Sequence, residues 1–283
     1  MADLVPGVEV ASQSGGMMLI TLLYHDVVDE GEELLSGFAG PIAARYKLSR
    51  TEFAAHLEAV AAAARRPPVT SPTSAVNGTG EIPWILSFDD GGSTALSRIA
   101  GALEDRSWRG LFFITTGRIG TPGFLDAGQI RELHDRGHVI GAHSENHPPR
   151  MSALEPDLIR EEWRRSCSTL ATLLNTPVEI ASVPGGYYSR GVAEAAAQVG
   201  IRALFTSEPT ARPDQVGDCK ILGRYTIRRG TPASVAAAIA AGATVPRLTQ
   251  ALSWKTKKLA KVVAGRRFID ASHLILRTLA KSS

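Results

Sequence analysis

The feature that most constrains this fold is a short apolar run that ends in two carboxylates and two glycines. Ile85-Leu86-Ser87-Phe88 is followed at once by Asp89-Asp90-Gly91-Gly92. This pattern predicts a buried strand that ends in a tight loop. Adjacent aspartates are costly in a packed interior, because desolvation and mutual repulsion oppose their ionisation. A metal ion or a proton-transfer role would offset that cost, and a polar turn with an aspartate N-cap is the simpler alternative.

A second apolar run also ends in residues that can bind a metal. Residues 138–142 are followed by His143-Ser144-Glu145-Asn146-His147. We place His143 at the end of a strand and His147 in the loop after it. Asp90, His143 and His147 would then form a set of two histidines and one carboxylate, which is typical of catalytic sites for zinc and similar ions. Two histidines that only cap or lie on the surface are the alternative.

The two stretches together resemble motifs of the polysaccharide deacetylase family, of the NodB-homology or carbohydrate esterase family 4 type. Residues 88–91 match its first motif, and residues 143–147 match its second, His-Ser/Thr-x-x-His. The resemblance covers residues 17 to 245. It implies an α/β fold, a distorted (β/α) barrel of about seven strands, with the active site at the C-terminal ends of the strands.

The resemblance also implies roles for the residues of both motifs. It makes Asp89 the general base and gives Asp90, His143 and His147 one divalent metal ion. We expect zinc, with cobalt or nickel as the alternatives. The implied reaction is removal of an N-acetyl group from an amino-sugar glycan.

A third candidate residue lies near the N-terminus. Met17 to Tyr24 predicts the first strand, which ends in His25-Asp26. Such an end resembles the poly-N-acetylglucosamine deacetylase-like subgroup, in which this histidine is the general acid. Because a barrel strand delivers its C-terminal residue into the site, we expect His25 to fill that role. A histidine that only packs or caps is the alternative.

The family's third motif, Arg-x-Pro-Tyr-Gly, is altered in this chain. A strand over residues 178–183 ends in Pro184-Gly185-Gly186-Tyr187-Tyr188, with Ser182 at the arginine position and Gly185 at the tyrosine position. A backbone N–H survives substitution, so we expect Gly185 to bind the oxyanion. We assign substrate binding to Tyr187 and Tyr188. A simple turn is the alternative.

In the family this arginine contacts the catalytic aspartate. Without it, Asp89 lacks the partner that would orient its carboxylate and set its pKa. Arg224 is the residue that we name as a substitute. No convincing copy of the family's fourth motif is present, and the spacing of Asp214 and Asp218 suggests a loop.

Other patterns predict the elements around these motifs. Ser49 and Glu52 form a capping box that opens a helix ending near Arg66. Further helices are predicted over residues 93–107, 126–137, 152–174, 189–200 and 231–242. The helix over 189–200 is alanine-rich. In the helix over 152–174 we expect four core residues: Leu158, Trp163, Leu170 and Leu173. The last strand is expected over residues 221–227.

Composition bounds the setting of the protein. The chain has 283 residues, of which 44% are hydrophobic, as expected for a soluble globular protein. Cys167 and Cys219 are far apart and outside any metal-type spacing, which favours a reducing compartment. The first 16 residues have no basic region of a signal peptide. We therefore expect a cytoplasmic protein, located in part at the inner face of the membrane.

The charge is unevenly distributed along the chain. Residues 247–283 contain nine Lys or Arg and one Asp, whereas the rest contains 22 basic and 27 acidic residues. We divide the chain into a catalytic barrel, 17–245, and a basic amphipathic helical tail, 246–283. Trp254 and nearby lysines would suit peripheral membrane contact or a helix packed on the barrel. We expect a glycan or lipid-linked glycan as substrate and no nucleic-acid partner.

Three other functions remain open from the sequence. The altered third motif is compatible with a catalytically impaired glycan-binding module on the same fold. The fold is also compatible with hydrolysis of another non-peptide C–N bond. A peripheral scaffold that works through its basic tail is the third. Our main hypothesis is a metal-dependent hydrolase acting on N-acetylated amino sugars of a cell-envelope polysaccharide.

Overall fold

A curved, mostly parallel sheet forms the centre of the protein in a computed structural model that describes residues 18–72 and 82–256. Its order is β11-β1-β4-β5-β6-β7-β8-β10-β9, and only the pair of β9 and β10 is antiparallel. The strands are β1 (Ile20–Tyr24), β4 (Trp84–Phe88), β5 (Leu111–Ile114), β6 (Val139–Ala142), β7 (Ile180–Ser182), β8 (Ala203–Phe205), β9 (Asp214–Val216), β10 (Cys219–Leu222) and β11 (Tyr225–Thr226). A small second sheet pairs β2 (Val27–Val28) with β3 (Leu48–Ser49).

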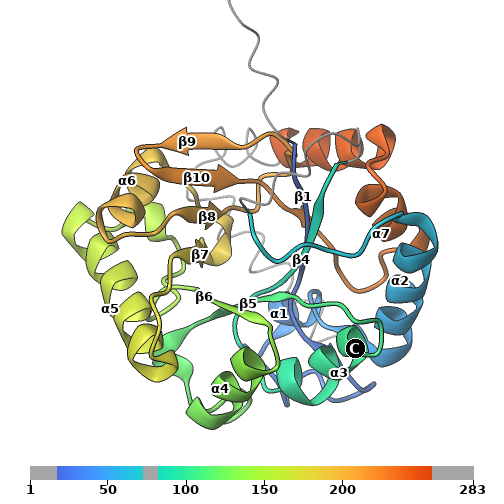
Figure 1. Cartoon of the computed structure of the whole chain (residues 1–283), viewed down its shortest axis with the longest axis horizontal. Helices are drawn as coiled ribbons and strands as arrows, with labels where there is room; N and C mark the ends of the chain where they lie inside the picture. The colour runs from blue at the N-terminus through green and yellow to red at the C-terminus, as the bar shows by residue number, and fades with distance from the viewer. Residues whose placement is uncertain (1–17, 73–81, 257–283) are drawn as a thin grey trace, which may run out of the picture.

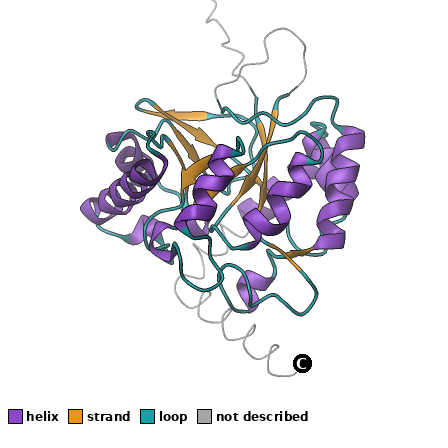
Figure 2. Ribbon diagram, turned by 60° about the horizontal axis from the view of Figure 1, so that its bottom comes forward, coloured by secondary structure: helices purple, strands orange, loops and turns teal. Residues whose placement is uncertain are grey.

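Helices cover the outer face of the curved sheet, as Figure 1 shows. They are α2 (Arg50–Ala63), α3 (Gly101–Glu104), α4 (Ala127–Asp135), α5 (Pro156–Leu174), α6 (Arg190–Gln198) and α7 (Ala233–Ala240), whereas the short helix α1 (Pro41–Ala44) lies nearer the centre of the view. The helices form one layer around the strands, which is clearest in Figure 2. The predicted distorted (β/α) barrel is therefore confirmed, with nine strands in its sheet rather than about seven.

Side chains alternate between two packed regions along each strand. In β4, Ile85 lies in a cluster inside the barrel, while Leu86 and Phe88 lie in the larger core between sheet and helices. Since side chains alternate with a period of two, Ser87 and then Asp89 continue the inner face. The strand therefore brings Asp89 to the inner edge of the barrel, where the sheet ends.

The predicted helix starts are largely confirmed by their caps. The Ser49 side chain accepts a hydrogen bond from the Glu52 N–H, and the Glu52 side chain accepts one from the Ser49 N–H. Asp126 forms the same box with Gln129 at the start of α4. Ser189 caps α6. Each cap satisfies backbone donors that the first helical turn cannot pair.

Several predicted boundaries and positions are wrong. The helix expected over 93–107 is a six-residue π-helix, Ala95–Ala100, followed by α3. The helix expected from Ser152 begins at Pro156, because a proline is well suited to the first helical position. Leu158 is 55% exposed and is not a core residue, unlike Trp163 and Leu170. The expected loop around Asp214 is an edge strand, β9, whose first two residues are polar and exposed.

The first part of the predicted tail packs on the barrel. A helix over Thr244–Thr256 places the Gln250 amide on the carbonyl oxygen of Thr226 in β11. The Trp254 ring lies 3.4 Å from the point that a Cβ on Gly186 would occupy. The second helical stretch of the tail lies outside the described residues, and membrane contact through 247–283 stays a prediction.

No single helix in residues 18–72 and 82–256 combines the length and hydropathy needed to cross a membrane. Only Ala233–Ala240 and Thr244–Thr256 reach such hydropathy as a pair, and they meet at a bend of 104°.

Candidate active site

Four of the predicted site residues come together because their strands run in parallel. Asp89 and Asp90 follow β4, and β6 is followed by His143 and His147. β5 lies between these two strands in the sheet. The C-terminal ends of parallel strands meet at one edge, as in other barrels with sites at this face.

Asp90, His143 and His147 form a geometric set that fits a divalent metal ion. The Nε2 atoms of His143 and His147 lie 3.4 and 3.6 Å from one Asp90 carboxylate oxygen. All three potential ligand atoms lie within 4.8 Å of one another. A tetrahedral ion about 2.0–2.1 Å from each ligand would separate those atoms by about 3.3–3.4 Å. The donor set and its spacing therefore fit a zinc-like ion.

The backbone at this site has an uncommon conformation. Asp90, Ser144 and His147 have φ values of 77°, 61° and 52°. Non-glycine residues rarely adopt this left-handed region, and each such residue costs about 1–3 kcal/mol. The Ser144 hydroxyl supports the turn by accepting a hydrogen bond from the His147 N–H at 3.0 Å. The fold holds the two ligand loops in a conformation that the chain alone would not favour.

Ser182 fixes the orientation of the His143 ring. The Nδ1 atom of His143 lies 2.6 Å from the Ser182 hydroxyl and 3.1 Å from the Ser182 carbonyl oxygen. A carbonyl only accepts, so Nδ1 is protonated, and Nε2 is the nitrogen that faces Asp90. An orienting partner of this kind is typical of histidines that bind metals. The serine at the altered third-motif position thus has a structural role.

Arg224 binds Asp89 through two parallel hydrogen bonds. Its Nη1 and Nη2 atoms donate to the two Asp89 oxygens at 2.7 and 2.8 Å, and Arg224 is fully buried. Ser182 donates a further bond to Asp89 at 3.1 Å. Burial raises the pKa of Asp89, but the charges of Arg224 and His143 outweigh it and hold that pKa below its usual range. Arg224 therefore takes the place of the missing arginine, as the sequence suggested.

The pKa values of the metal-binding set diverge. Burial raises the pKa of Asp90, but hydrogen bonding to His143 and the nearby histidine charges lower it overall. Burial lowers the pKa of His143, but Asp89 and Asp90 raise it above its usual value. Burial and the charge of His143 lower the pKa of His147 to about 4. His147 is thus neutral at pH 7 and has a lone pair for an ion.

His25, which follows β1, lies near the two aspartates. Its charge lowers the pKa values of both Asp89 and Asp90, which places it within electrostatic reach. Its ring packs on Tyr46, with centroids 4.7 Å apart. The buried Nδ1 has no hydrogen-bond partner among the described residues. The histidine therefore keeps a nitrogen free for proton exchange.

The turn after β7 brings Gly185 close to the histidine loop. Gly185 has a φ of 62°. The Pro149 carbonyl oxygen lies 3.6 Å from the point that a Cβ added to Gly185 would occupy. The Tyr187 ring is 3.4 Å from that same point. Tyr188 instead packs against the helix-side core, with Asp214 and Glu208 as charged neighbours. Oxyanion binding by Gly185 and substrate binding by the two tyrosines stay predictions.

Glu162 on helix α5 holds the histidine loop, and no sequence pattern predicted this role. Its carboxylate accepts from the backbone N–H groups of Glu145 and Asn146 at 3.0 and 2.9 Å. It also accepts from the Asn146 side chain at 2.7 Å. A glutamate on a charged helix resembles any solvated residue, so only tertiary structure identifies this contact.

A second buried cluster holds the loop over residues 29–40 in place. It consists of Asp26, Ser36, Lys47 and Thr94, and we call it the loop anchor. The Lys47 ammonium donates to the carbonyl oxygens of Glu33, Ser36 and Phe38 at 2.5–2.7 Å. One Asp26 oxygen accepts from the hydroxyls of Ser36 and Thr94. The loop places the Phe38 ring 4.6 Å from the His147 ring.

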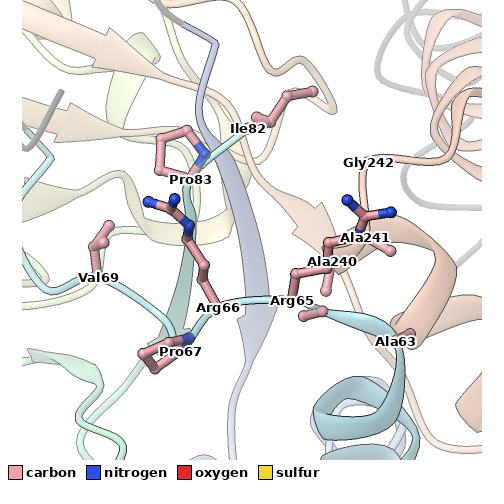
Figure 3. A pocket seen from close by; sticks show the side chains of 11 residues that line it. Ala63, Arg65, Arg66, Pro67, Val69, Ile82, Pro83, Ala240, Ala241 and Gly242 are labelled. Atoms are coloured by element: carbon pink, nitrogen blue, oxygen red, sulfur yellow. The ribbon is translucent and has the colours of Figure 1, made fainter. Parts of the chain in front are cut away.

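A cavity of about 310 Å³ lies at the opposite end of the barrel (Figure 3). It lies between the C-terminal ends of α2 and α7, where Arg65, Arg66 and Pro67 approach Ile82 and Gly242. Its lining has no Asp, Glu or His. The clustered carboxylates and histidines are instead gathered at the C-terminal ends of the strands.

Comparison with known proteins places these features in a family. Residues 77–204, which contain Asp89, Asp90, His143 and His147, match the sequence profile of the polysaccharide deacetylase family. This match assigns residues 77–204, rather than the whole chain, to a polysaccharide deacetylase domain. The resemblance inferred from the two motifs is thereby confirmed. No curated protein sequence matches the chain.

Solved structures share the fold of this deacetylase domain. The deacetylase PplD of Streptococcus pyogenes, solved with acetate, is 19% identical, with a TM-score of 0.64 over 77% of this chain and 96% of its own. IcaB of Ammonifex degensii is 22% identical, with a TM-score of 0.64 over 81% and 98%. BC0361, a polysaccharide deacetylase of Bacillus cereus, is 17% identical, with a TM-score of 0.64 over 79% and 69%.

Proposed function

We propose that this protein is a metal-dependent hydrolase that removes N-acetyl groups from amino sugars of a glycan. One observation carries the proposal: a carboxylate fixed by Arg224 lies directly beside a set of two histidines and one aspartate. Asp89 is 3.9 Å from the Nε2 atom of His143, which also faces Asp90. A base and a metal-binding set in contact are the parts that hydrolysis of an unactivated amide requires.

The ion would be held by Asp90, His143 and His147. A divalent ion there supplies a Lewis acid that polarises the acetyl carbonyl and makes a water molecule more acidic. Ser182 keeps the His143 ring in the tautomer that offers Nε2. The low pKa of His147 keeps its lone pair available at neutral pH.

Asp89 accepts the proton of the attacking water. Arg224 and Ser182 occupy part of its lone-pair positions and fix the direction of those that remain. The Gly185 N–H donates to the oxygen that gains charge as the carbonyl is attacked. His25 then gives a proton to the nitrogen of the amine that leaves. The products are acetate and a free amino sugar.

The test is acetate release from oligomers of N-acetylglucosamine by the purified protein supplied with zinc, cobalt or nickel. Asp89→Asn should keep the fold and the metal while acetate release falls by at least about 10³-fold, because a positioned base contributes about 10²–10⁴-fold. Asp135→Asn, an exposed site on α4, is the matched control. Full activity of Asp89→Asn would show that Asp89 is not the base. Oligomer binding without any acetate release by the wild type would favour a glycan-binding module.

A further inference from the structure

Three arginines surround the candidate site, each stacked on an aromatic ring. In each pair the guanidinium carbon lies close to the ring centroid, a distance typical of cation–π contacts. The pairs are Arg118 over Phe38 at 5.5 Å, Arg150 over Tyr187 at 5.5 Å and Arg228 over Tyr46 at 5.1 Å.

Each aromatic ring in turn contacts a residue of the site. Phe38 lies 4.6 Å from the ring of the metal-binding residue His147. Tyr46 lies 4.7 Å from the ring of His25. The third ring, Tyr187, borders Gly185 in the turn after β7. The three cations are therefore one side chain removed from three different parts of the site.

These arginines are not neutralised by carboxylates within the described part of the chain. Arg98, Arg136 and Arg229 pair with Glu32, Glu104 and Glu33. In contrast, Arg118 and Arg150 are exposed and form no ion pair there. The Arg228 Nη2 donates to the Tyr46 hydroxyl at 3.3 Å, and its buried Nε has no hydrogen-bond partner in residues 18–72 and 82–256. Positive charge without a carboxylate partner in the described residues thus lies next to the aromatic rings that border the site.

An arginine held on an aromatic face keeps its N–H groups available for a ligand. Stacking restricts the guanidinium while leaving its edge donors open, and a guanidinium matches the two oxygens of a carboxylate or phosphate. A neutral glycan needs no such charge. Charge of one sign around a cleft also speeds the approach of a ligand of the opposite sign.

We propose that the substrate is an anionic glycan, with carboxylate or phosphate groups on or beside the N-acetylated sugar. Arg118 and Arg150 bind these groups from the two outer sides, and Arg228 adds charge beside His25. This inference rests on the proposed function and specifies its substrate class.

The experiment compares acetate release from matched neutral and charged substrates. The first pair is a tetramer of N-acetylglucosamine and a tetrasaccharide that alternates N-acetylglucosamine with glucuronic acid. The second pair is N-acetylglucosamine and its 1-phosphate, so that the pairs distinguish carboxylate from phosphate. We expect kcat/KM to be at least about tenfold higher for the charged member of one pair, and to fall with added salt.

Variants show whether the arginines cause that preference. Arg118→Gln and Arg150→Gln should each reduce kcat/KM on the charged substrate about tenfold more than on its neutral partner. Arg131→Gln, on the exposed face of α4, is the control and should change neither. Equal rates within both pairs, or equal losses on charged and neutral substrates, would overturn the proposal.

A binding measurement separates this inference from the proposed function. The two tetrasaccharides and the two monosaccharides are titrated calorimetrically into zinc-loaded Asp89→Asn. Tighter binding of a charged ligand, reduced by Arg118→Gln with Arg150→Gln, supports the anionic substrate even if no acetate is released. Absence of release would then count only against hydrolysis. Binding that is absent or equal for charged and neutral ligands would overturn the inference.

Discussion

The candidate site and the loop anchor each contain a buried aspartate and a buried cation, but they arrange them differently. In the site, Arg224 donates two bonds directly to Asp89. In the loop anchor, Lys47 donates to three carbonyl oxygens, and Asp26 accepts from two hydroxyls. The cation of the site therefore fixes a carboxylate side chain, whereas that of the anchor fixes a segment of backbone.

The pKa shifts of the two aspartates follow this difference. Burial raises both pKa values, but Arg224 reverses the effect at Asp89, while the hydroxyls and Lys47 do not at Asp26. Burial also lowers the pKa of Lys47, although Asp26 and Asp90 oppose this. A direct bidentate ion pair outweighs the effect of burial on the pKa of Asp89, whereas the hydroxyl donors and Lys47 do not outweigh it at Asp26. The comparison predicts three effects of decreasing size.

Replacement of Arg224 should have the largest effect. Arg224→Met leaves Asp89 buried without its counter-charge, so the free energy of unfolding should fall by about 3–5 kcal/mol in urea titrations. The pKa of Asp89 should rise, which moves the acidic limb of the kcat/KM profile to higher pH. Arg164→Met, at an exposed ion pair with Glu161, is the control and should change little. Wild-type stability in Arg224→Met would mean that the pair does not stabilise the fold.

Replacement of Lys47 should have an intermediate effect. Lys47→Met leaves three carbonyl oxygens without their donor, and we expect a loss of about 2–3 kcal/mol in unfolding free energy. Hydrogen exchange should accelerate in residues 33–38, and KM should rise because Phe38 loses its fixed position beside His147. The exposed Lys255→Met is the control. Unchanged exchange in the loop would contradict the anchor.

Replacement of Asp26 should have the smallest effect and a distinctive pH dependence. The pKa of Asp26 is higher in the folded protein than in the unfolded chain, so its contribution to stability is largest at low pH and is lost as pH rises through the folded pKa. Asp26→Asn should differ from the wild type by less than about 1 kcal/mol at pH 4. It should then gain relative stability towards pH 7.

Asp89→Asn provides the opposite case in metal-free protein. The pKa of Asp89 is lowered by folding, so its contribution is present above the unfolded pKa and is lost as pH falls through the folded pKa. This variant should therefore lose stability relative to the wild type as pH rises from 3 to 5. Urea unfolding between pH 3 and pH 7 measures how the stability of each variant relative to the wild type changes with pH, and a change in the same direction for both variants would refute the comparison.

The predictability of these regions from sequence also differs. Asp89, Asp90, His143 and His147 stand at the ends of apolar runs, so the placement of the metal-binding set followed from strand patterns and a family resemblance. Arg224 could be named as a substitute but not placed, because its partner is 135 residues away.

The loop anchor gave no signal at all. Lys47 lies between a tyrosine and a leucine near a helix start and resembles a surface lysine, because nothing local shows that three carbonyls surround it. Ser182 was identified only as the residue at an altered position, and its bond to His143 depends on the pairing of β6 and β7. β9 was missed because a polar edge strand lacks the alternation that predicts strands.

The most direct test of the account is the metal content of the purified protein, measured by elemental mass spectrometry beside His143→Ala and His134→Ala. His143 is a proposed ligand, whereas His134 lies on α4 beside Asp135. We predict about one zinc, cobalt or nickel ion per chain in the wild type and in His134→Ala, and none in His143→Ala. A wild-type protein that stays empty after incubation with each of the three ions would contradict the metal site and the hydrolysis derived from it.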